Sequence, residues 1–253
     1  MNLILKPNFS AHQIDLFLKR PFDALLSSIA LVLSSWLWVL ITIAIMIEDG
    51  EPVIIKQIRV GKKGIKFTSY KFRSMVKSTL REKVNHQASE NDLRITRVGK
   101  FLRRTALDEL PQLINILIGD MSFVGPRALL PQEIEINGNP KCVSIEELPG
   151  YKRRITVRPG LTGIAQIFAP RDLPRKHKFK YDLLYIRKMG LIYDLRLILV
   201  SFLITFKGKW ETRQTKLKNL RKRETEFYHR PFAWFTTDSQ VTSKQMGSFL
   251  HTE

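Results

Sequence analysis

The chain contains one long apolar run, from residue 24 to residue 47, in which no side chain is charged. This length meets the roughly 20 residues that a helix needs to cross the hydrocarbon core of a bilayer. A signal peptide does not fit, because the run is too long, ends in the acidic residues Glu48, Asp49 and Glu51, and has no obvious small-residue cleavage site. We therefore predict a membrane helix over residues 19–50, preceded by a lead-in of mixed polarity at residues 1–18.

The charges that flank this run leave its topology open. Lys19 and Arg20 precede it, and five basic residues follow it closely, namely Lys56, Arg59, Lys62, Lys63 and Lys66. The positive-inside rule would keep both ends in the cytoplasm, and a helix that enters the bilayer and turns back would satisfy it. Ser34 and Ser35 could pair with backbone groups freed by such a bend. From charge alone, a spanning helix and a re-entrant helix are equal alternatives.

Short stretches with β-strand character follow the membrane segment. Residues 53–57 form one, residues 61–64 indicate a turn, and residues 65–73 alternate with a period of two. On the second strand Lys71 and Arg73 share one face. Basic residues on a hairpin usually form a solvated face, but this pair is also a candidate for binding phosphate.

A second apolar segment covers residues 191–206 and carries two charges, Asp194 and Arg196. It is short for a span and favours a helix lying in the headgroup region, with a buried core helix as the alternative. Residues 209–253 are polar and basic, and we expect most of them to be loosely ordered. The fold class predicted is α+β: a small sheet packed by helices over residues 51–208, held on the membrane by the apolar helix and by interfacial amphipathic helices.

Composition narrows the kind of partner. Lys and Arg outnumber Asp and Glu by 42 to 23 in the 253 residues, which gives a net charge of +19. Such a balance indicates an anionic partner: nucleic acid, anionic lipid or a phosphorylated substrate. The single cysteine, Cys142, excludes an intrachain disulfide and a cysteine-based metal cluster.

Two adjacent carboxylates, Asp108 and Glu109, stand out in this basic chain. Either Thr105 caps a helix with Asp108 three residues later, or Asp108 is the cap and Pro111 lies in the first turn; the proline favours the second arrangement. Both arrangements place the acids at a helix N-terminus, where the helix dipole stabilises negative charge. An isolated pair of this kind is most often only a cap.

The arginines around the pair favour a functional site instead. Arg103 lies about one helical turn before Asp108, and Arg127 and Arg158 are held in turns formed with Gly-Pro and Pro-Gly. Arginine suits bidentate contact with phosphate. Mg²⁺ is typically bound through one or two carboxylates together with substrate phosphates. We therefore predict a diphosphate site with a magnesium ion held by Asp108 and Glu109.

With these features the chain resembles the bacterial sugar transferases, which are monotopic phosphoglycosyl transferases acting on polyprenyl phosphate. The resemblance covers residues 19–208 and rests on five blocks that occur in the order of the family. They are Lys19-Arg20-x-Phe22-Asp23, Gln57-x-Arg59-Val60-Gly61, Tyr70-Lys71-Phe72-Arg73-Ser74-Met75, Leu107-Asp108-Glu109-Leu110-Pro111-Gln112 with Gly119-Asp120-Met121-Ser122-Phe123-Val124-Gly125-Pro126-Arg127, and Arg158-Pro159-Gly160-Leu161-Thr162-Gly163-x-Ala165-Gln166.

The resemblance implies a two-step phosphosugar transfer. An aspartate attacks the β-phosphate of a nucleoside-diphosphate sugar, usually uridine-linked, and polyprenyl (undecaprenyl) phosphate then takes the phosphosugar from the enzyme. Carried over, Asp108 is the nucleophile and Glu109 supports magnesium. The implied substrate ligands are Arg103 and Arg127, with Lys71, Arg73, Arg158, Gln57 and Arg59 as further contacts. Lys19, Arg20 and Asp23 are implied at the membrane, where the lipid phosphate arrives.

The resemblance also implies a place and a pathway. It places the chain at the bacterial inner (cytoplasmic) membrane with the catalytic domain in the cytoplasm, where it would start lipid-linked glycan assembly for exopolysaccharide or lipopolysaccharide. The chain departs from the family at Ser35-Trp36, where a Ser-Pro pair usually breaks the membrane helix. It departs again at residues 167–172, where the family often has an Asn-Gly-Arg-like segment, and this leaves the sugar open.

Two other classes of protein are weaker alternatives. A basic nucleic-acid-binding protein would explain the net charge but neither the apolar run nor the ordered motifs. An inactive membrane scaffold for glycan assembly is opposed by the intact Asp108-Glu109 pair. We expect no nucleic-acid partner, and the sequence leaves formation of a homo-oligomer open.

Overall fold

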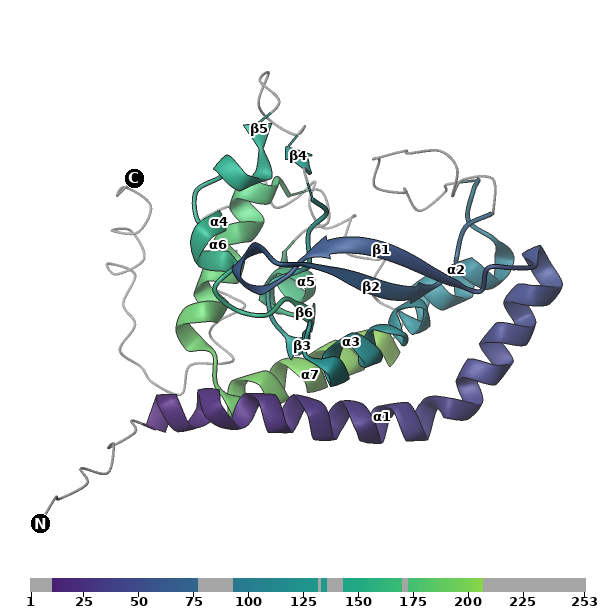
Figure 1. Cartoon of the computed structure of the whole chain (residues 1–253), viewed down its shortest axis with the longest axis horizontal. Helices are drawn as coiled ribbons and strands as arrows, with labels where there is room; N and C mark the ends of the chain where they lie inside the picture. Colours follow the sequence, from purple (N-terminus) through teal and green to yellow (C-terminus); the bar gives the residue numbers. More distant parts are fainter. Residues whose placement is uncertain (1–10, 77–92, 132, 136–142, 170–172, 207–253) are drawn as a thin grey trace, which may run out of the picture. The chain divides into compact units, whose positions relative to one another are not determined.

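The computed structural model describes residues 11–76, 93–131, 133–135, 143–169 and 173–206, which form a mixed helix-and-strand fold (Figure 1). The segments 1–10 and 209–253 of the predicted lead-in and tail lie outside these residues. In chain order the elements are α1 (Ala11–Asp49), β1 (Ile54–Val60), η1 (Lys62–Gly64), β2 (Lys66–Phe72), α2 (Arg97–Arg104), η3 (Leu107–Glu109), α3 (Gln112–Ile118), β3 (Ser122–Val124), β4 (Ile134–Glu135), β5 (Val143–Ser144), η4 (Ile145–Glu147), α4 (Tyr151–Arg154), β6 (Gly160–Thr162), α5 (Ile164–Phe168), α6 (Arg175–Lys188) and α7 (Leu191–Phe206).

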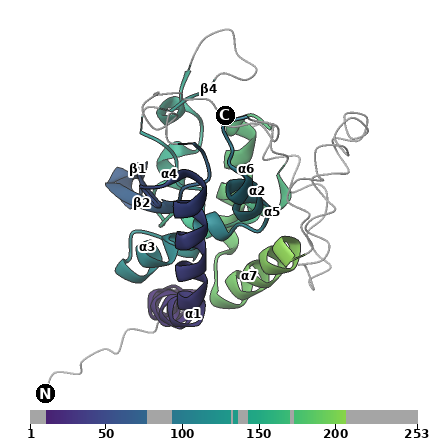
Figure 2. The same cartoon turned by 90° about the vertical axis from the view of Figure 1, so that its right-hand side faces the viewer.

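The predicted membrane helix corresponds to α1, which begins at Ala11, well before the predicted start at residue 19, and ends at Asp49. Within the described residues, the segment Phe17–Asp49 is the one helix long and apolar enough to cross a membrane by length and composition. Its backbone stays helical through Ser35 and Trp36, yet Figures 1 and 2 show that it bends. Serine hydroxyls along α1 bond to carbonyls of the preceding turn, as Ser28 Oγ does to Ala24 over 2.9 Å and Ser34 Oγ to Leu31 over 3.5 Å, and such bonding favours bending.

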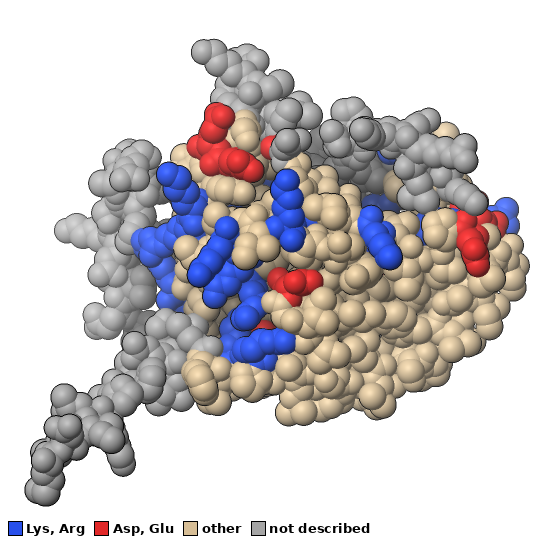
Figure 3. Space-filling view, in the orientation of Figure 1, with Lys and Arg blue, Asp and Glu red and all other residues tan. Residues whose placement is uncertain are grey.

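Both parts of the bent helix contact the rest of the domain. The first part lies beside α3, β3 and α7, and the last part reaches α2 (Figures 1 and 2). Between these contacts α1 presents large apolar side chains to the outside, with Val32 73% and Ile47 82% exposed. The space-filling view accordingly shows an extended uncharged surface where α1 lies, with Lys and Arg gathered elsewhere on the same face (Figure 3).

The predicted hairpin is confirmed, with a longer first strand than expected. β1 and β2 pair antiparallel in a register that sets Ile54 opposite Phe72 and Val60 opposite Lys66. One core cluster joins this hairpin to the last part of α1 and to α2 through Ile41, Ile45, Phe72 and Leu102. A second cluster lies around α4 and α6 and contains Leu129, Ile145, Leu148, Tyr151 and Phe179.

The two turn-rich segments of the sequence contain short parallel strands that the pattern did not predict. β3 and β6 pair with Ser122 opposite Gly160, and the described strands form three two-stranded sheets instead of the single small sheet expected. The two backbones approach so closely that a Cβ on Gly160 would lie 2.0 Å from the nitrogen of Gly125. Glycine at these positions therefore allows the Gly-Pro-Arg and Arg-Pro-Gly turns to pack against each other.

The helix α7 has two unlike sides. Asp194 and Leu197 are buried toward the domain, whereas Ile192 is 69% and Phe202 65% exposed. Exposed apolar residues on one side are typical of a helix that lies in a membrane interface. Its placement there stays a prediction.

Candidate active site

The acidic pair lies on η3, a single turn of 3₁₀-helix between α2 and α3. Thr105 ends α2, and its hydroxyl donates to the Phe101 carbonyl over 2.8 Å, so the prediction that Thr105 caps a following helix is wrong. Asp108 is not the cap either, because Pro111 occupies that position at the start of α3. Both acids lie on η3 and precede the N-terminus of α3 without being part of its first turn.

A lysine from the hairpin reaches this pair. Lys71 of β2 donates to Glu109 Oε1 in an ion pair whose two side chains are 18% and 24% exposed. Asn115, buried inside α3, fixes the approach of the two elements: its Nδ2 donates to the Thr68 carbonyl over 2.7 Å, and its Oδ1 accepts from the backbone N–H of Tyr70 over 3.2 Å. The sequence analysis missed Asn115, although a lone amide within the apolar run 113–118 was a usable signal.

The two carboxyl groups titrate in opposite directions. Burial, reinforced by the charge of Glu109, raises the pKa of Asp108 from 3.8 to about 6, although Lys71 and Arg103 act against the rise. Burial alone would also raise the pKa of Glu109, but the charges of Lys71 and Arg127 outweigh it and leave this pKa below the ordinary value of 4.5. Adjacent carboxyl groups whose pKa values are shifted in opposite directions are typical of sites in which the two groups have different roles.

Arg127 is presented on a firmly held turn. Its side chain is exposed, while its carbonyl accepts a hydrogen bond from Arg154 Nη2. Arg154 is buried and paired with Asp182 of α6 over 2.7 Å. On the next residue, the Ala128 carbonyl accepts from Arg59 Nη1 over 3.0 Å. The part that Arg154 and Asp182 take in holding the Arg127 turn could not be predicted from the sequence, because both residues lie far from Arg127 along the chain.

Arg59 and Gln57 lie on β1 and bond to each other. Arg59 Nη2 donates to Gln57 Oε1 over 2.5 Å, and the charges of Arg127 and Glu109 both act on the Arg59 guanidinium. Of the predicted site residues, the structure thus brings Asp108, Glu109, Lys71, Arg103, Arg127, Arg59 and Gln57 into one neighbourhood.

The remaining predicted basic residues make structural contacts elsewhere. Arg73 is buried at the end of the hairpin, 3.1 Å from Asp49 Oδ2, and donates to the Gly50 carbonyl over 2.7 Å. Arg158 Nε donates to the Gly119 carbonyl over 2.8 Å, at the C-terminal end of α3. A cation at that end also complements the helix dipole.

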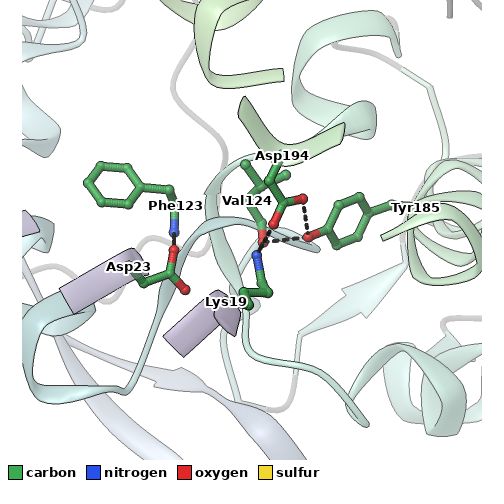
Figure 4. Close-up of polar contacts among 6 residues, drawn as sticks. All are labelled: Lys19, Asp23, Phe123, Val124, Tyr185 and Asp194. Carbon is green, nitrogen blue, oxygen red and sulfur yellow. Dashed lines mark hydrogen bonds and ion pairs between the residues drawn. The ribbon is translucent and has the colours of Figure 1, made fainter. Parts of the chain in front are cut away.

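The three residues predicted to meet the lipid phosphate contact the domain. Lys19 is ion-paired with Asp194 of α7, which also accepts from the Tyr185 hydroxyl over 2.8 Å (Figure 4). Asp23 is buried and accepts from the Phe123 backbone N–H over 3.2 Å (Figure 4). Arg20 donates to two carbonyls in the last turn of α3 over 2.7 and 2.6 Å. These contacts attach the first part of α1 to the domain.

Magnesium at the carboxylate pair stays a prediction. Among the described residues there is no group of three or more His, Cys, Asp or Glu side chains that could hold a metal, so a closed protein cage is not present there. Mg²⁺ prefers oxygen ligands and usually retains waters and substrate phosphates. Burial is the main cause of the raised pKa of Asp108, and a divalent cation beside this carboxyl group would favour its ionised form.

Comparisons with known proteins identify the family. A sequence model described as "Bacterial sugar transferase" matches residues 14–208. The chain is 42% identical over 200 residues to a UDP-glucose:undecaprenyl-phosphate glucose-1-phosphate transferase of Klebsiella pneumoniae, a match covering 77% of this chain and 41% of that protein. It is 39% identical over 203 residues to the exopolysaccharide production protein PSS of Rhizobium leguminosarum bv. phaseoli, covering 77% of this chain and 99% of that protein.

A third relative carries a different sugar in its name. It is an undecaprenyl-phosphate galactose phosphotransferase of Salmonella typhimurium, 35% identical over 200 residues, with 72% of this chain and 39% of that protein covered. The chain thus spans about two fifths of the length of the Klebsiella and Salmonella relatives, and nearly all of the Rhizobium one. Since the family match covers well over half of the chain, this protein belongs to the bacterial sugar transferase family.

Proposed function

We propose that this protein transfers a sugar 1-phosphate from a uridine-diphosphate sugar to polyprenyl phosphate and so starts the assembly of a lipid-linked glycan. The observation that carries the proposal is the placement of Asp108, whose pKa is raised, beside Glu109, which is paired with Lys71, within a group of arginines. The names of the relatives support the same reaction class, since they join a UDP-sugar or a sugar phosphate to undecaprenyl phosphate.

The reaction proceeds in two half-reactions on one carboxylate. An oxygen of Asp108 forms a bond to the β-phosphorus, the bond from that phosphorus to the bridging oxygen breaks, and UMP leaves with the electron pair. The sugar phosphate is then held as an acyl phosphate on Asp108. A phosphate oxygen of polyprenyl phosphate attacks the same phosphorus, and the bond to Asp108 breaks. The products are a polyprenyl-diphospho-sugar and the free carboxylate.

The neighbouring charges have separate tasks in this scheme. Arg127, exposed on its fixed turn, and Arg103 bind the diphosphate and stabilise the charge that develops on it. Lys71 holds Glu109 ionised beside the nucleophile. Asp108 and Glu109 would hold Mg²⁺, which when bound supplies further positive charge at the diphosphate.

The bent α1 supports a re-entrant membrane helix. A straight span would carry the start and the end of the apolar run to opposite faces of the bilayer. Here Arg20 is bonded to α3 at one end of the run, and Ile45 packs with Phe72 at the other, both within the same domain. We infer that the helix enters and leaves on one side, which is the cytoplasmic side by the positive-inside rule.

The test is release of UMP by the purified protein in detergent with Mg²⁺, polyprenyl phosphate and a panel of UDP-sugars. We expect the wild type to release UMP with at least one sugar. We expect Asp108→Asn to release no UMP and to form no covalent phosphosugar adduct. Glu146→Gln serves as the matched control, because Glu146 is an exposed acid on η4. Release by Asp108→Asn at the wild-type rate would show that another group is the nucleophile. If the folded wild type releases no UMP with any sugar, the inactive scaffold is favoured.

A further inference from the structure

The acceptor's phosphate needs a basic surface near the membrane, and the first cations of α1 do not provide it. Lys19 is ion-paired with Asp194, and Arg20 is bonded to carbonyls of α3. Exposed cations that lie between α1 and Asp108 are found on the helix α2.

One face of α2 is exposed and basic. Arg97, Lys100 and Arg104 are exposed, and their spacing of three and four residues places them on the same side of the helix. Phe101 lies on that side too and is 51% exposed. The opposite side, with Gly99 and Leu102, is buried in the domain.

The two ends of α2 connect this face to the membrane helix and to the nucleophile. At its first turn, Glu48 near the end of α1 accepts from the backbone N–H groups of Arg97 and Val98 over 2.6 and 2.9 Å. At its last turn, Thr105 leads directly into η3, which carries Asp108. Figures 1 and 2 both place α2 beside the last part of α1. The helix is about 12 Å long, so the cations form a short row between the two.

We propose that this exposed face of α2 (Arg97, Lys100, Phe101 and Arg104) binds the phosphate of the polyprenyl acceptor and delivers it to the phosphosugar on Asp108. The three cations meet the phosphate, and Phe101 contacts the first isoprene units at the level of the headgroups, where aromatic side chains are favoured. The proposal rests on the proposed function and assigns it an acceptor subsite distinct from the diphosphate ligands Arg103 and Arg127.

The test separates the two half-reactions. The triple variant Arg97→Gln, Lys100→Gln and Arg104→Gln is compared with a control that removes the same charge from three exposed lysines of the hairpin, Lys56→Gln, Lys62→Gln and Lys66→Gln. In neutral detergent micelles, the α2 variant should show a roughly tenfold higher KM for polyprenyl phosphate. Its KM for the UDP-sugar and its covalent adduct, formed without acceptor, should match the wild type, and the control should be unchanged in every step.

Each other outcome has a definite meaning. An unchanged KM for polyprenyl phosphate in the α2 variant would overturn the subsite, while turnover of the wild type would leave the proposed function standing. A defect that appears only in bilayers containing anionic phospholipid, and not in neutral micelles, would assign the face to the bilayer surface and also overturn the proposal. Failure of the wild type itself to release UMP would reject the proposed function, on which the subsite depends.

A second readout addresses Phe101 alone. Phe101→Ala keeps all three charges, so a rise in KM for polyprenyl phosphate but not for a short, water-soluble prenyl phosphate would support contact with the lipid chain. Equal KM values for wild type and variant with both acceptors would remove Phe101 from the subsite.

Discussion

At the scale of single residues, the carboxyl group of Asp108 opposes folding at neutral pH. Its folded-state pKa of about 6 lies above the ordinary value of 3.8, so between these values the folded protein keeps a proton that the unfolded chain releases. The contribution of this group to stability is therefore full below pH 3.8 and is lost as pH rises through 6. A nucleophile that must be ionised thus destabilises the fold that holds it.

Removing the charge should stabilise the protein. We expect Asp108→Asn to raise the free energy of unfolding at pH 7.5 by about 1–3 kcal/mol, since each unit of pKa shift corresponds to about 1.4 kcal/mol. Thermal unfolding of the variant and the wild type in detergent at pH 7.5 and at pH 5 measures this difference in stability. The difference should be smaller at pH 5. A variant less stable than the wild type at pH 7.5 would contradict the raised pKa.

The same shift predicts the pH dependence of the first half-reaction. Under the proposed mechanism the attacking carboxylate must be ionised, so the rate of adduct formation should fall as pH drops below the pKa of Asp108, which is about 6 without a metal ion and would be lowered by bound Mg²⁺. Single-turnover release of UMP between pH 5 and 8 measures the profile. A rate that stays constant down to pH 5 would instead indicate that the carboxyl group is ionised throughout this range.

At the scale of elements, the site depends on how α3 is attached to the hairpin. Asn115 makes the connection through the Thr68 carbonyl and the Tyr70 N–H, and Lys71 is the next residue along the strand. The elements themselves could be predicted, because the apolar run, the alternating strands and the acids before a helix are local patterns. The attachment could not, because it joins residues distant in sequence.

Loss of this attachment should weaken both stability and turnover. Asn115→Leu keeps the branched shape of the side chain, with a larger volume, but leaves the Thr68 and Tyr70 backbone groups without their partner, at a cost of about 1–3 kcal/mol each if they stay dry. We expect a lower melting temperature and slower adduct formation, because the Lys71–Glu109 pair would lose its fixed geometry. Asn115→Asp and the exposed change Lys176→Gln provide a conservative and a neutral comparison in the same two assays.

The membrane helix offers a second prediction at this scale. In intact cells of a Cys142→Ser background, a cysteine introduced at Asn2 should stay unlabelled by an impermeant maleimide and react only after permeabilisation. A cysteine at Lys56 serves as the reference for the domain side. Labelling at position 2 without permeabilisation would establish a spanning helix.

At the scale of the whole molecule, apolar surface and charge lie in different places. The uncharged surface of α1 lies apart from most of the Lys and Arg on the same face (Figure 3), and α7 also exposes large apolar side chains. The roles predicted for the site residues stay predictions, whereas the structural contacts of Lys19 and Arg20 could not be predicted, because an exposed and an ion-paired lysine look alike in sequence. Their partners, Asp194 and the last turn of α3, are supplied only by the fold.

This separation predicts how the protein is held on the membrane. At 1 M NaCl the Debye length falls to about 3 Å, so attraction between charges is screened, whereas apolar burial is not. Membrane fractions washed with 1 M NaCl should therefore retain the protein. Sedimentation and immunoblotting measure the retained fraction. Complete release by salt would indicate attachment through charge alone, as would be expected of the nucleic-acid-binding alternative bound to other material.

The short helix α3 has a consequence for which acceptors the protein can use. Its C-terminal turn is bonded to Arg20 of α1, and its first residue, Gln112, follows Glu109 after only Leu110 and Pro111, so this one short helix connects the apolar helix to the acidic pair. Under the proposed function, the height at which phosphoryl transfer occurs belongs to the protein and is independent of the lipid's tail. Polyprenyl phosphates of different chain lengths would then present their phosphate equally well, and selection among glycan pathways would fall on the sugar nucleotide.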